Sequence, residues 1–561
     1  MVTVNGVDDR PAPTPDVLPR SRFQGNHEYP LPPTPVLGGI PLGTQVRMAI
    51  TAIRLGLSGT AWVGLTDSDE VTAELREYGE IYRTNPGVPR FMIPLARPVM
   101  PGASGEIVVI NSPRMVREAY TQPKGYIDFE AGKDPWLRFG LGMNTPFLLD
   151  GESHRTVRRA LTPELTQKQV ETYRAMSVEV LDRHIDELPL HRKVSMQKFF
   201  YRFTQEIVLR VVFGMADPRE IDEYRSALNR FVRLGMDSIG RWVTATAIGI
   251  VLDNYRRHSD ILPPVARAPK VRLDRLIEAK MAQFRAHPSD DCIAGRLMKA
   301  TAGDPFWTDA VLLDYLRTLL LAGHETSVTA YSFTLDLLLH HPEEAAKVTA
   351  EARAATTDRY AQAANNEGLR LRSPIWGLPI IPRRDIVVGG YRVKQGTFLF
   401  TMPSALHSDP DAYPEPREFK PERFLDKAPD RFGFMSFSAN QHRCPGINFY
   451  MIEANIVLHR LFGRLDMRPA RSKPERSHLA LTAFTRPAHG AKVIVENRRP
   501  AQTVPIFKIS DADRVRAATM RAPVPEDFPR DASPQVTEPA LPSGAPDTVR
   551  VCPFAEGNGK G

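Results

Sequence analysis

The stretch 437–446 places one cysteine, Cys444, between a turn and the residues of a predicted helix. Apolar side chains recur at helical spacing over 447–462, so the thiol should lie just ahead of a helix N-terminus. The positive end of the helix dipole, with His442 and Arg443 beside it, favours the thiolate, a good ligand for a soft metal. A buried free cysteine is the alternative interpretation. No second Cys/His pair stands at zinc-ligand spacing, so one thiolate suits a haem iron better than zinc.

A second candidate site lies in the middle of a long apolar segment. Thr308 is a plausible N-cap, residues 309–341 support one continuous helix, and Pro342 ends it. Near its centre, Glu325 stands beside Thr326, and an acid next to an alcohol can relay protons from solvent to a reacting group. The alternative is that the threonine hydroxyl only bonds a carbonyl one turn earlier.

Gly323 precedes this acid in mid-helix, where glycine costs about 1 kcal/mol relative to alanine. A close neighbour explains it better than helix formation does, and a bulky, flat cofactor is such a neighbour. Ala322 beside it is also small, so the pair would leave room over that cofactor.

Two further pairs have spacings that place them on one helix face. His154 and Arg158 are four residues apart, and two cations on one face make sense if an anion lies opposite, although a solvated basic face is the alternative. Glu367 and Arg370 are three apart, which is commonly only a surface ion pair.

Together these stretches resemble the cytochrome P-450 family. The first motif surrounds the cysteine: Phe437 stands seven residues before it, His442 two before it and Gly446 two after it. The second is the stretch Ala322-Gly-His-Glu-Thr-Ser327. The third is Glu367-x-x-Arg370, followed by Arg423.

The resemblance implies a mainly α-helical fold with a small β region, shaped as a triangular prism with a long central helix over haem b (iron protoporphyrin IX). It implies that Cys444 is the axial ligand of the haem iron and that Glu325 and Thr326 manage protons. It places Phe437, His442, Gly446, Ala322 and Gly323 at the haem and gives the haem propionates to His154 and Arg158. It also implies that Glu367, Arg370 and Arg423 form a buried network that supports the haem loop.

The sequence departs from the family pattern at two positions. Asn440 stands where relatives usually have glycine, and asparagine is the next most tolerant residue of a positive φ. Ile381 stands where relatives commonly have a propionate-binding arginine, so Arg383 or Arg384 is expected to take that role.

The chemistry implied is a monooxygenase reaction that inserts one oxygen atom from O2 into an apolar organic substrate, by hydroxylation or epoxidation. Electrons would come from NAD(P)H through a reductase and a separate ferredoxin or flavodoxin. Arg155, Arg159 and Arg443 would form the docking face for that acidic partner. A haem-thiolate peroxygenase or isomerase without a redox partner, and a haem sensor without turnover, are the alternatives.

Composition is consistent with one soluble catalytic domain. The 561 residues carry a net charge of +8, too mild for a nucleic-acid partner, and three cysteines without disulfide spacing suit the cytoplasm. We expect a Pro-rich arm at 1–35, the catalytic domain at 36–498, and a tail at 499–561 that is disordered or lies on the surface. No apolar segment is long enough to span a bilayer. The apolar stretch 55–66 could rest on a membrane surface, but we expect it to pack against the body of the protein.

Overall fold

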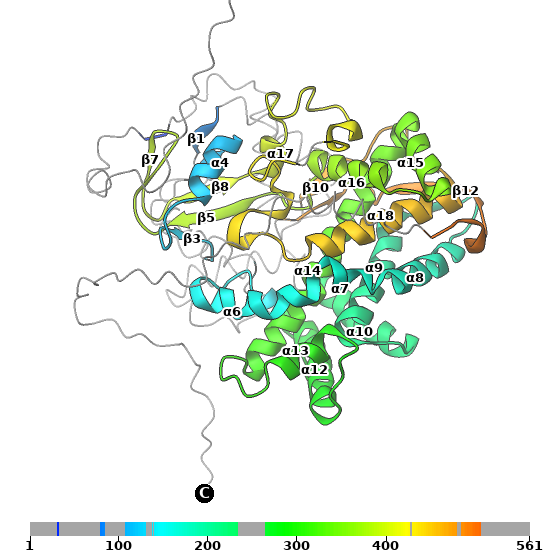
Figure 1. Ribbon diagram of the computed structural model, residues 1–561, viewed down its shortest axis with the longest axis horizontal. Helices are drawn as coiled ribbons and strands as arrows, with labels where there is room; N and C mark the ends of the chain where they lie inside the picture. Colours follow the sequence, from blue (N-terminus) through cyan, green and yellow to red (C-terminus); the bar gives the residue numbers. More distant parts are fainter. Residues whose placement is uncertain are drawn as a thin grey trace, which may run out of the picture. The chain divides into compact units, whose positions relative to one another are not determined.

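The computed structural model describes residues 31–32, 79–84, 107–130, 137, 140–233, 264–426, 429–479 and 484–506, and the fold is mainly helical (Figure 1). Its helices are α4 (Pro113–Tyr120), α6 (Gly151–Leu161), α7 (Gln167–Glu171), α8 (Arg174–Asp186), α9 (Met196–Phe213), α10 (Pro218–Phe231), α12 (Pro264–Ala286), α13 (Ile293–Ala300), α14 (Asp309–His340), α15 (Pro342–Ala354), α16 (Arg359–Leu371), α17 (Pro403–Leu406) and α18 (Ile447–Arg464). Its strands are β1 (Ile81–Thr84), β2 (Ile107–Ile110), β3 (Ile127–Asp128), β4 (Lys193–Ser195), β5 (Leu378–Pro382), β6 (Ile386–Val388), β7 (Tyr391–Val393), β8 (Phe398–Thr401), β9 (Leu465–Pro469), β10 (Ser477–Leu479), β11 (Thr485–Pro487) and β12 (Lys492–Arg498).

The predicted central helix is confirmed as α14, and it is shared by two hydrophobic cores. The Thr308 hydroxyl caps it by accepting from the Val311 N–H, and Pro342 begins the next helix. The 32 residues of α14 span roughly 48 Å. Its first half packs with α10, α12 and α13, and its second half packs with α8, α9, α16 and α18. A helix that is apolar on nearly all sides is stable only in such an interior.

Among the described residues, the strands form a small β region of four sheets, and the resemblance implied such a region. The largest has the order β1-β2-β8-β5-β3, in which β2 and β8 are parallel. The β-branched and aromatic residues at 106–110, 386–393 and 397–400 predict strands, and these segments correspond to β2, β6, β7 and β8. The β-branched side chains of β2, β6 and β7 are buried together with those of α4, whose N-cap Ser112 accepts from the Met115 N–H. This sheet therefore fixes α4 beside the rest of the fold.

Two predictions near the start of the chain need correction. The apolar spacing of residues 68–82 predicts a helix, but Ile81 and Tyr82 belong to β1, where they pair with β2. The part before residue 79 lies outside the described residues, as do most of the expected arm and the segment 55–66. Within the expected arm, Pro32 is buried, and its carbonyl accepts a 2.6 Å hydrogen bond from Arg83.

The chain stays packed beyond the expected domain boundary at residue 498. A short 3-10 turn covers Ala501–Thr503, and Val504 is 5% exposed against Gly463 of α18. Arg460 of α18 donates to the carbonyls of Ala501 and Val504. Residues 499–506 are thus part of the folded body, and the expected tail from 507 lies outside the described residues.

The aliphatic stretch that we expected at 231–255 is described only as far as residue 233. Within the described ranges, no helix combines the length and apolar character that crossing a bilayer would require.

Candidate functional site

The centre of α14 is open along one narrow stripe. Between residues 315 and 338 every side chain is buried except Leu319, Ala322, Gly323 and Thr326, which are partly exposed. Spacings of three and four residues place these four on one face of the helix. Small or apolar residues thus line an accessible strip within an otherwise buried helix.

Cys444 lies in a tight loop directly before α18. Its backbone N–H donates to the Phe437 carbonyl at 2.8 Å, which closes the loop, and Gly446 is the N-cap of α18. The Phe437 ring packs 5.6 Å from the ring of Tyr450. Cys444 is exposed as a residue, although protein groups lie close enough to its sulfur to desolvate it, whereas Cys292, the other cysteine in the described part of the chain, is buried.

The electrostatics of Cys444 differ from the expectation that its position favours the thiolate. Desolvation by the surrounding protein raises the pKa of the thiol, although the Gly446 N–H and the charges of Arg158 and Arg443 act to lower it. The helix terminus and the arginines therefore only offset part of the desolvation cost. A bound metal cation would supply the remaining stabilisation of the anion.

His154 and His442 lie together in a stack of three rings, a contact that the sequence did not predict. His442 lies between Phe129, at 4.3 Å and 20°, and His154, at 4.2 Å and 24°. The His442 Nε2 is 3.7 Å from the carboxylate of Asp150, the residue that caps α6 through the Gly151 N–H. Burial alone would raise the pKa of Asp150, but His442, the Gly151 N–H and Arg383 hold it below its usual value. The stack fastens the Cys444 loop to α6.

Arg158 follows His154 by one turn of α6 and points into the interior. Within the described residues, no hydrogen bond or ion pair of its guanidinium is present. Burial lowers its pKa, and the nearby Cys444 and Tyr315 act in the opposite direction. A largely buried arginine without a protein acceptor fits an anionic ligand group close to Cys444.

Arg383 and Arg384, the expected substitutes for the missing propionate arginine, both contact protein groups instead. Arg383 lies 3.3 Å from Asp128 and 3.4 Å from Asp150. The guanidinium of Arg384 sits 4.3 Å from the centre of the Tyr126 ring. In this arrangement Arg158 is the arginine better placed to receive a cofactor carboxylate.

Glu325 lies on the side of α14 that faces α9 and the β10–β11 hairpin. Its Oε2 accepts from Tyr201 at 2.8 Å and from Arg486 at 3.0 Å, and its Oε1 lies 3.4 Å from His324. Burial would raise its pKa, but the Arg486 charge, His324 and Tyr201 outweigh burial and hold the pKa at about 2. The carboxylate is ionised at neutral pH. Sequence reasoning missed Tyr201 and Arg486, which nothing in the local pattern links to residue 325.

Thr326 makes the bond that we considered as its structural alternative. Its hydroxyl donates to the Ala322 carbonyl at 3.0 Å. The side chain is still on the accessible stripe, so the oxygen can also accept from a group outside the helix.

Gly323 has a different close neighbour from the one that we expected. A Cβ at this position would lie 2.9 Å from a methyl group of Val208 on α9. The missing side chain therefore permits close packing of α9 on α14, and the expected cofactor is not needed to explain it.

Glu367, Arg370 and Arg423 form a buried network, as the resemblance implied. Glu367 and Arg370 are fully buried and joined by two bonds of 2.7 and 2.8 Å, and Arg423 lies 3.3 Å from the same carboxylate. His407, which the sequence did not single out, connects α16 to the Cys444 loop. Its two ring nitrogens contact the Arg370 carbonyl at 2.9 Å and the Met435 N–H at 3.0 Å. Desolvation lowers the pKa of His407 to about 3, so it is neutral.

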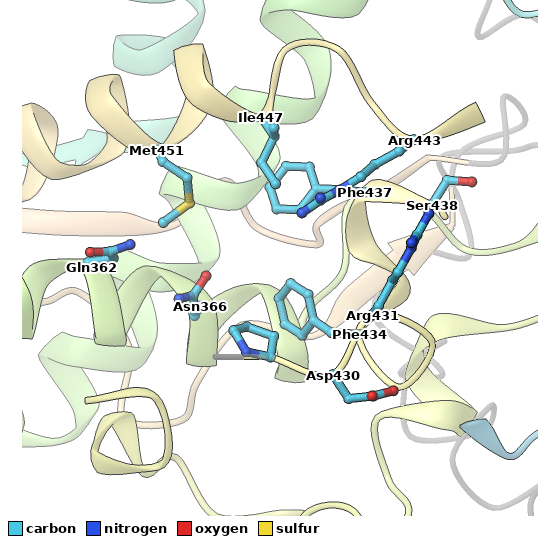
Figure 2. A pocket seen from close by; sticks show the side chains of 11 residues that line it. Gln362, Asn366, Asp430, Arg431, Phe434, Phe437, Ser438, Arg443, Ile447 and Met451 are labelled. Atoms are coloured by element: carbon cyan, nitrogen blue, oxygen red, sulfur yellow. The ribbon is translucent and has the colours of Figure 1, made fainter. Parts of the chain in front are cut away.

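Figure 2 shows a pocket between α16, α18 and the Cys444 loop. Phe434 and Phe437 line it together with Met451, and the side chains of Arg431 and Arg443 lie along its other wall. The pocket gives the loop a basic outer surface. In the part of the chain that the structure describes, no three His, Cys, Asp or Glu side chains gather into a metal-binding set.

Comparison with known proteins identifies this arrangement. A profile of the cytochrome P-450 family matches residues 102–495. The chain belongs to the cytochrome P-450 family. The family implies a haem cofactor and a monooxygenase activity, and the Cys444 thiol, the partly buried Arg158 and the stripe on α14 are a donor set and a surface that fit a haem.

Individual relatives agree with this assignment. The Mycobacterium tuberculosis protein named cytochrome P-450 137 is 28% identical over 376 residues, covering 66% of this chain and 77% of its own. The Mycobacterium bovis protein named cytochrome P-450 135B1 is 25% identical over 471 residues, or 82% of this chain and 92% of its own. The crystal structure of the cytochrome P-450DA haem domain superposes with a TM-score of 0.64 at 18% identity, covering 84% and 98% of the two chains. At that identity the structure supports the fold alone.

Proposed function

We propose that this P-450 inserts one oxygen atom from O2 into an apolar organic substrate, by hydroxylation or epoxidation, with Cys444 as the axial ligand of the haem iron. When bound, the haem supplies the redox chemistry of oxygen activation, and the thiolate ligand favours cleavage of the O–O bond. The observation that supports this proposal best is the pairing of Cys444, an exposed residue at a helix N-terminus, with a partly buried arginine nearby that has no acceptor among the described residues.

His154 and Arg158 are the proposed propionate ligands. Both lie on the inner face of α6, and both residue types make charge-assisted hydrogen bonds to carboxylates. His442 is proposed to orient His154, because their rings stack at 4.2 Å. Glu367, Arg370 and Arg423 are proposed to keep the Cys444 loop in place through His407.

Glu325 and Thr326 are proposed to control protons at the site. The ionised Glu325 accepts hydrogen bonds from Tyr201 and Arg486, so it can take up a proton only after its contact with Arg486 weakens. Thr326 can orient a proton donor on the accessible stripe, since its hydroxyl already donates to the helix and has lone pairs free to accept.

An apolar substrate is proposed because Leu319 and Ala322 contribute most of the accessible stripe that precedes Thr326. The helices around the first half of α14 add further apolar side chains from α10 and α12.

A separate ferredoxin or flavodoxin, reduced by an NAD(P)H-dependent reductase, is the proposed electron donor. Arg155, Arg159 and Arg443 are the proposed docking residues, together with Arg431, which shares the pocket beside the loop. Arg155 and Arg159 both bind Glu152 in this structure, but these pairs are exposed and worth little in free energy. An acidic partner can therefore replace Glu152.

The first experiment tests the ligand. The purified, haem-loaded protein is reduced and exposed to carbon monoxide, and we expect the strongly red-shifted Soret band of thiolate-ligated haem. Cys444→Ala should lose this band, while the matched variant Cys292→Ser should keep it, since Cys292 is buried at the start of α13. A band that persists in Cys444→Ala would refute the assignment.

The second experiment separates a monooxygenase from a peroxygenase. Panels of apolar compounds that shift the haem spectrum are incubated with NAD(P)H and a surrogate ferredoxin with its reductase. We expect oxygenated product under these conditions and none with peroxide alone. Efficient peroxide-driven turnover that exceeds the reductase-driven rate would favour the alternative.

A further inference from the structure

Asn440 occupies a strained position four residues before Cys444. Its φ is 53°, in the left-handed region that asparagine tolerates better than most residues. It begins a short 3-10 turn, and its carbonyl accepts the Arg443 N–H at 3.0 Å. Conformational freedom alone would be met equally well by glycine.

The side chain of Asn440 makes two contacts that glycine could not make. The Oδ1 accepts from the Arg431 Nη2 at 2.9 Å, and the Nδ2 donates to the backbone carbonyl of Tyr120 at the end of α4. The orientation of the amide is fixed by these partners, because a flipped amide would set its N–H groups against the arginine and its oxygen against a carbonyl. One carboxamide thus joins α4, the Cys444 loop and Arg431.

Arg431 is held close to a like charge. Both Arg431 and Arg443 line the pocket beside the loop (Figure 2), and burial together with the charge of Arg431 lowers the pKa of Arg443. Two neighbouring guanidinium groups repel each other, so Arg431 needs acceptors to remain there. The neutral Oδ1 of Asn440 is such an acceptor, and the ring of Phe432, 5.6 Å away, is a second contact.

We infer that Asn440 is a positioning residue that sets the charge around the haem-thiolate centre: its carboxamide keeps Arg431 beside Arg443 and fastens the loop to α4. The inference rests on the proposed role of Cys444 as the iron ligand. Reduction of a ferric haem adds one negative charge, which nearby cations stabilise. Arg431 therefore raises the reduction potential of the haem, and Asn440 acts through Arg431.

The test compares Asn440→Gly, Arg431→Gln and the double variant by spectroelectrochemical titration of the haem-loaded protein at low salt. Asn440→Gly keeps the backbone free to adopt a positive φ and removes only the carboxamide. Asn448→Ala is the matched control, because the Asn448 amide also donates to a backbone carbonyl, that of Leu165 at 3.0 Å, and belongs to α18 rather than to the loop.

We expect Asn440→Gly and Arg431→Gln each to move the haem potential to more negative values, and the double variant to match Arg431→Gln alone. Asn448→Ala should retain the wild-type potential, and all four proteins should retain the thiolate carbon monoxide band. A wild-type potential in Asn440→Gly, or shifts that simply add in the double variant, would overturn the inference. Absence of the thiolate band in the wild-type protein would instead refute the proposed role of Cys444.

Discussion

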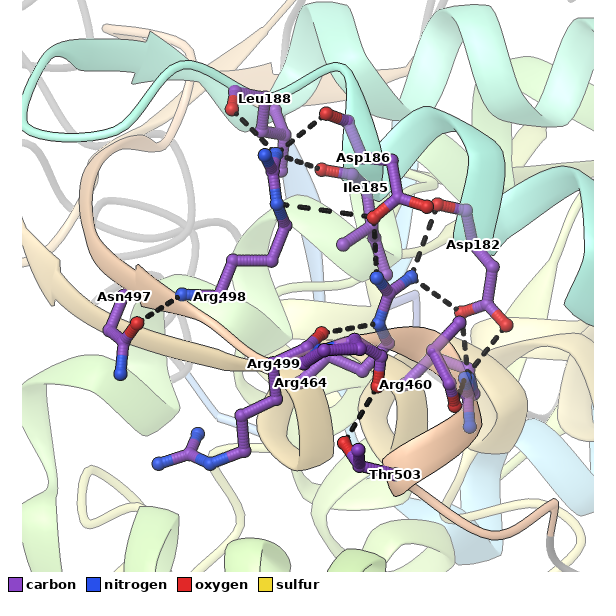
Figure 3. A network of polar contacts seen from close by, with 12 residues as sticks. Asp182, Ile185, Asp186, Leu188, Arg460, Arg464, Asn497, Arg498, Arg499 and Thr503 are labelled. Atoms are coloured by element: carbon purple, nitrogen blue, oxygen red, sulfur yellow. Dashed lines mark hydrogen bonds and ion pairs between the residues drawn. The ribbon is translucent and has the colours of Figure 1, made fainter.

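Removal of the Asp182 carboxylate should destabilise the protein far more than loss of an exposed ion pair. Asp182 on α8 accepts from Arg460 at 2.8 and 2.7 Å and from Arg464 at 3.0 Å, and both arginines belong to α18 (Figure 3). The same arginines bind the carbonyls of Arg499, Ala501 and Val504. Asp182 therefore neutralises Arg460 and Arg464, the two buried arginines whose hydrogen bonds hold residues 499–504 against α18.

The magnitude follows from the burial of the two arginines. Their side chains are only 3% and 0% exposed, so Asp182→Ala leaves Arg460 without a carboxylate and Arg464 with Asp186 alone. Breaking a buried ion pair by removing one partner costs about 3–5 kcal/mol. Because Asp182 is itself 15% exposed and the carbonyl contacts remain, we expect about 3 kcal/mol.

The assay is equilibrium urea unfolding followed by far-UV circular dichroism, with Glu496→Ala as the matched control. Glu496 pairs with Arg468 at 2.7 Å, but both side chains are more than half exposed, so its loss should cost less than about 1 kcal/mol. Hydrogen exchange at the amides of 499–504 should also accelerate in Asp182→Ala. If Asp182→Ala lost no more stability than Glu496→Ala, and exchange at 499–504 stayed unchanged, the account of this network would be wrong.

Three further outcomes are expected. Gly323→Ala should lower the melting temperature, because the new methyl group clashes with Val208 and costs about 1–3 kcal/mol of unfolding free energy. Val208→Ala should relieve that loss in the double variant. A loss that Val208→Ala does not relieve would contradict the packing role. Burial raises the pKa of Glu453 to about 8, so folding stabilises the neutral form of this carboxyl group. The free energy of unfolding should therefore fall by on the order of 3–5 kcal/mol as pH rises from about 5 to 8. When the two proteins are titrated in parallel, Glu453→Gln should show no such loss. Arg486→Gln should raise the pKa of Glu325. The measurement is the amount of substrate oxygenated per NAD(P)H consumed as a function of pH, and its profile should shift toward higher pH. An unshifted profile would mean that Glu325 does not control proton supply.

Features of the fold that depend on neighbouring residues could be predicted from the sequence. The cap Thr308 and the terminating Pro342 define α14, and the turn before Cys444 leads into α18 as its apolar spacing indicated. In these elements the side chain, its backbone partner and the apolar periodicity lie within a few residues of each other. The spacing of Glu367 and Arg370 was equally visible, although only the structure reveals that the pair is buried.

Features that depend on contacts between distant segments could not be predicted. The residue next to Gly323 is set by how α9 approaches α14, and no pattern around residue 323 encodes Val208. Arg383 directly follows β5, and the pairing of β5 with β3 brings it to Asp128 and Asp150, contacts that no pattern around residue 383 encodes. Composition and spacing carry no information about such pairings.

The acid beside Thr326 is where this limit matters most for function. A glutamate next to a threonine indicates a proton relay, and that interpretation assumes that the acid can change its protonation state near neutral pH. In the structure, Tyr201 and Arg486, at 124 and 161 positions from Glu325, hold the carboxylate ionised. The proposed proton transfer through Glu325 would therefore require the Arg486 contact to open first, so under that proposal the hairpin that carries Arg486 would act together with α14.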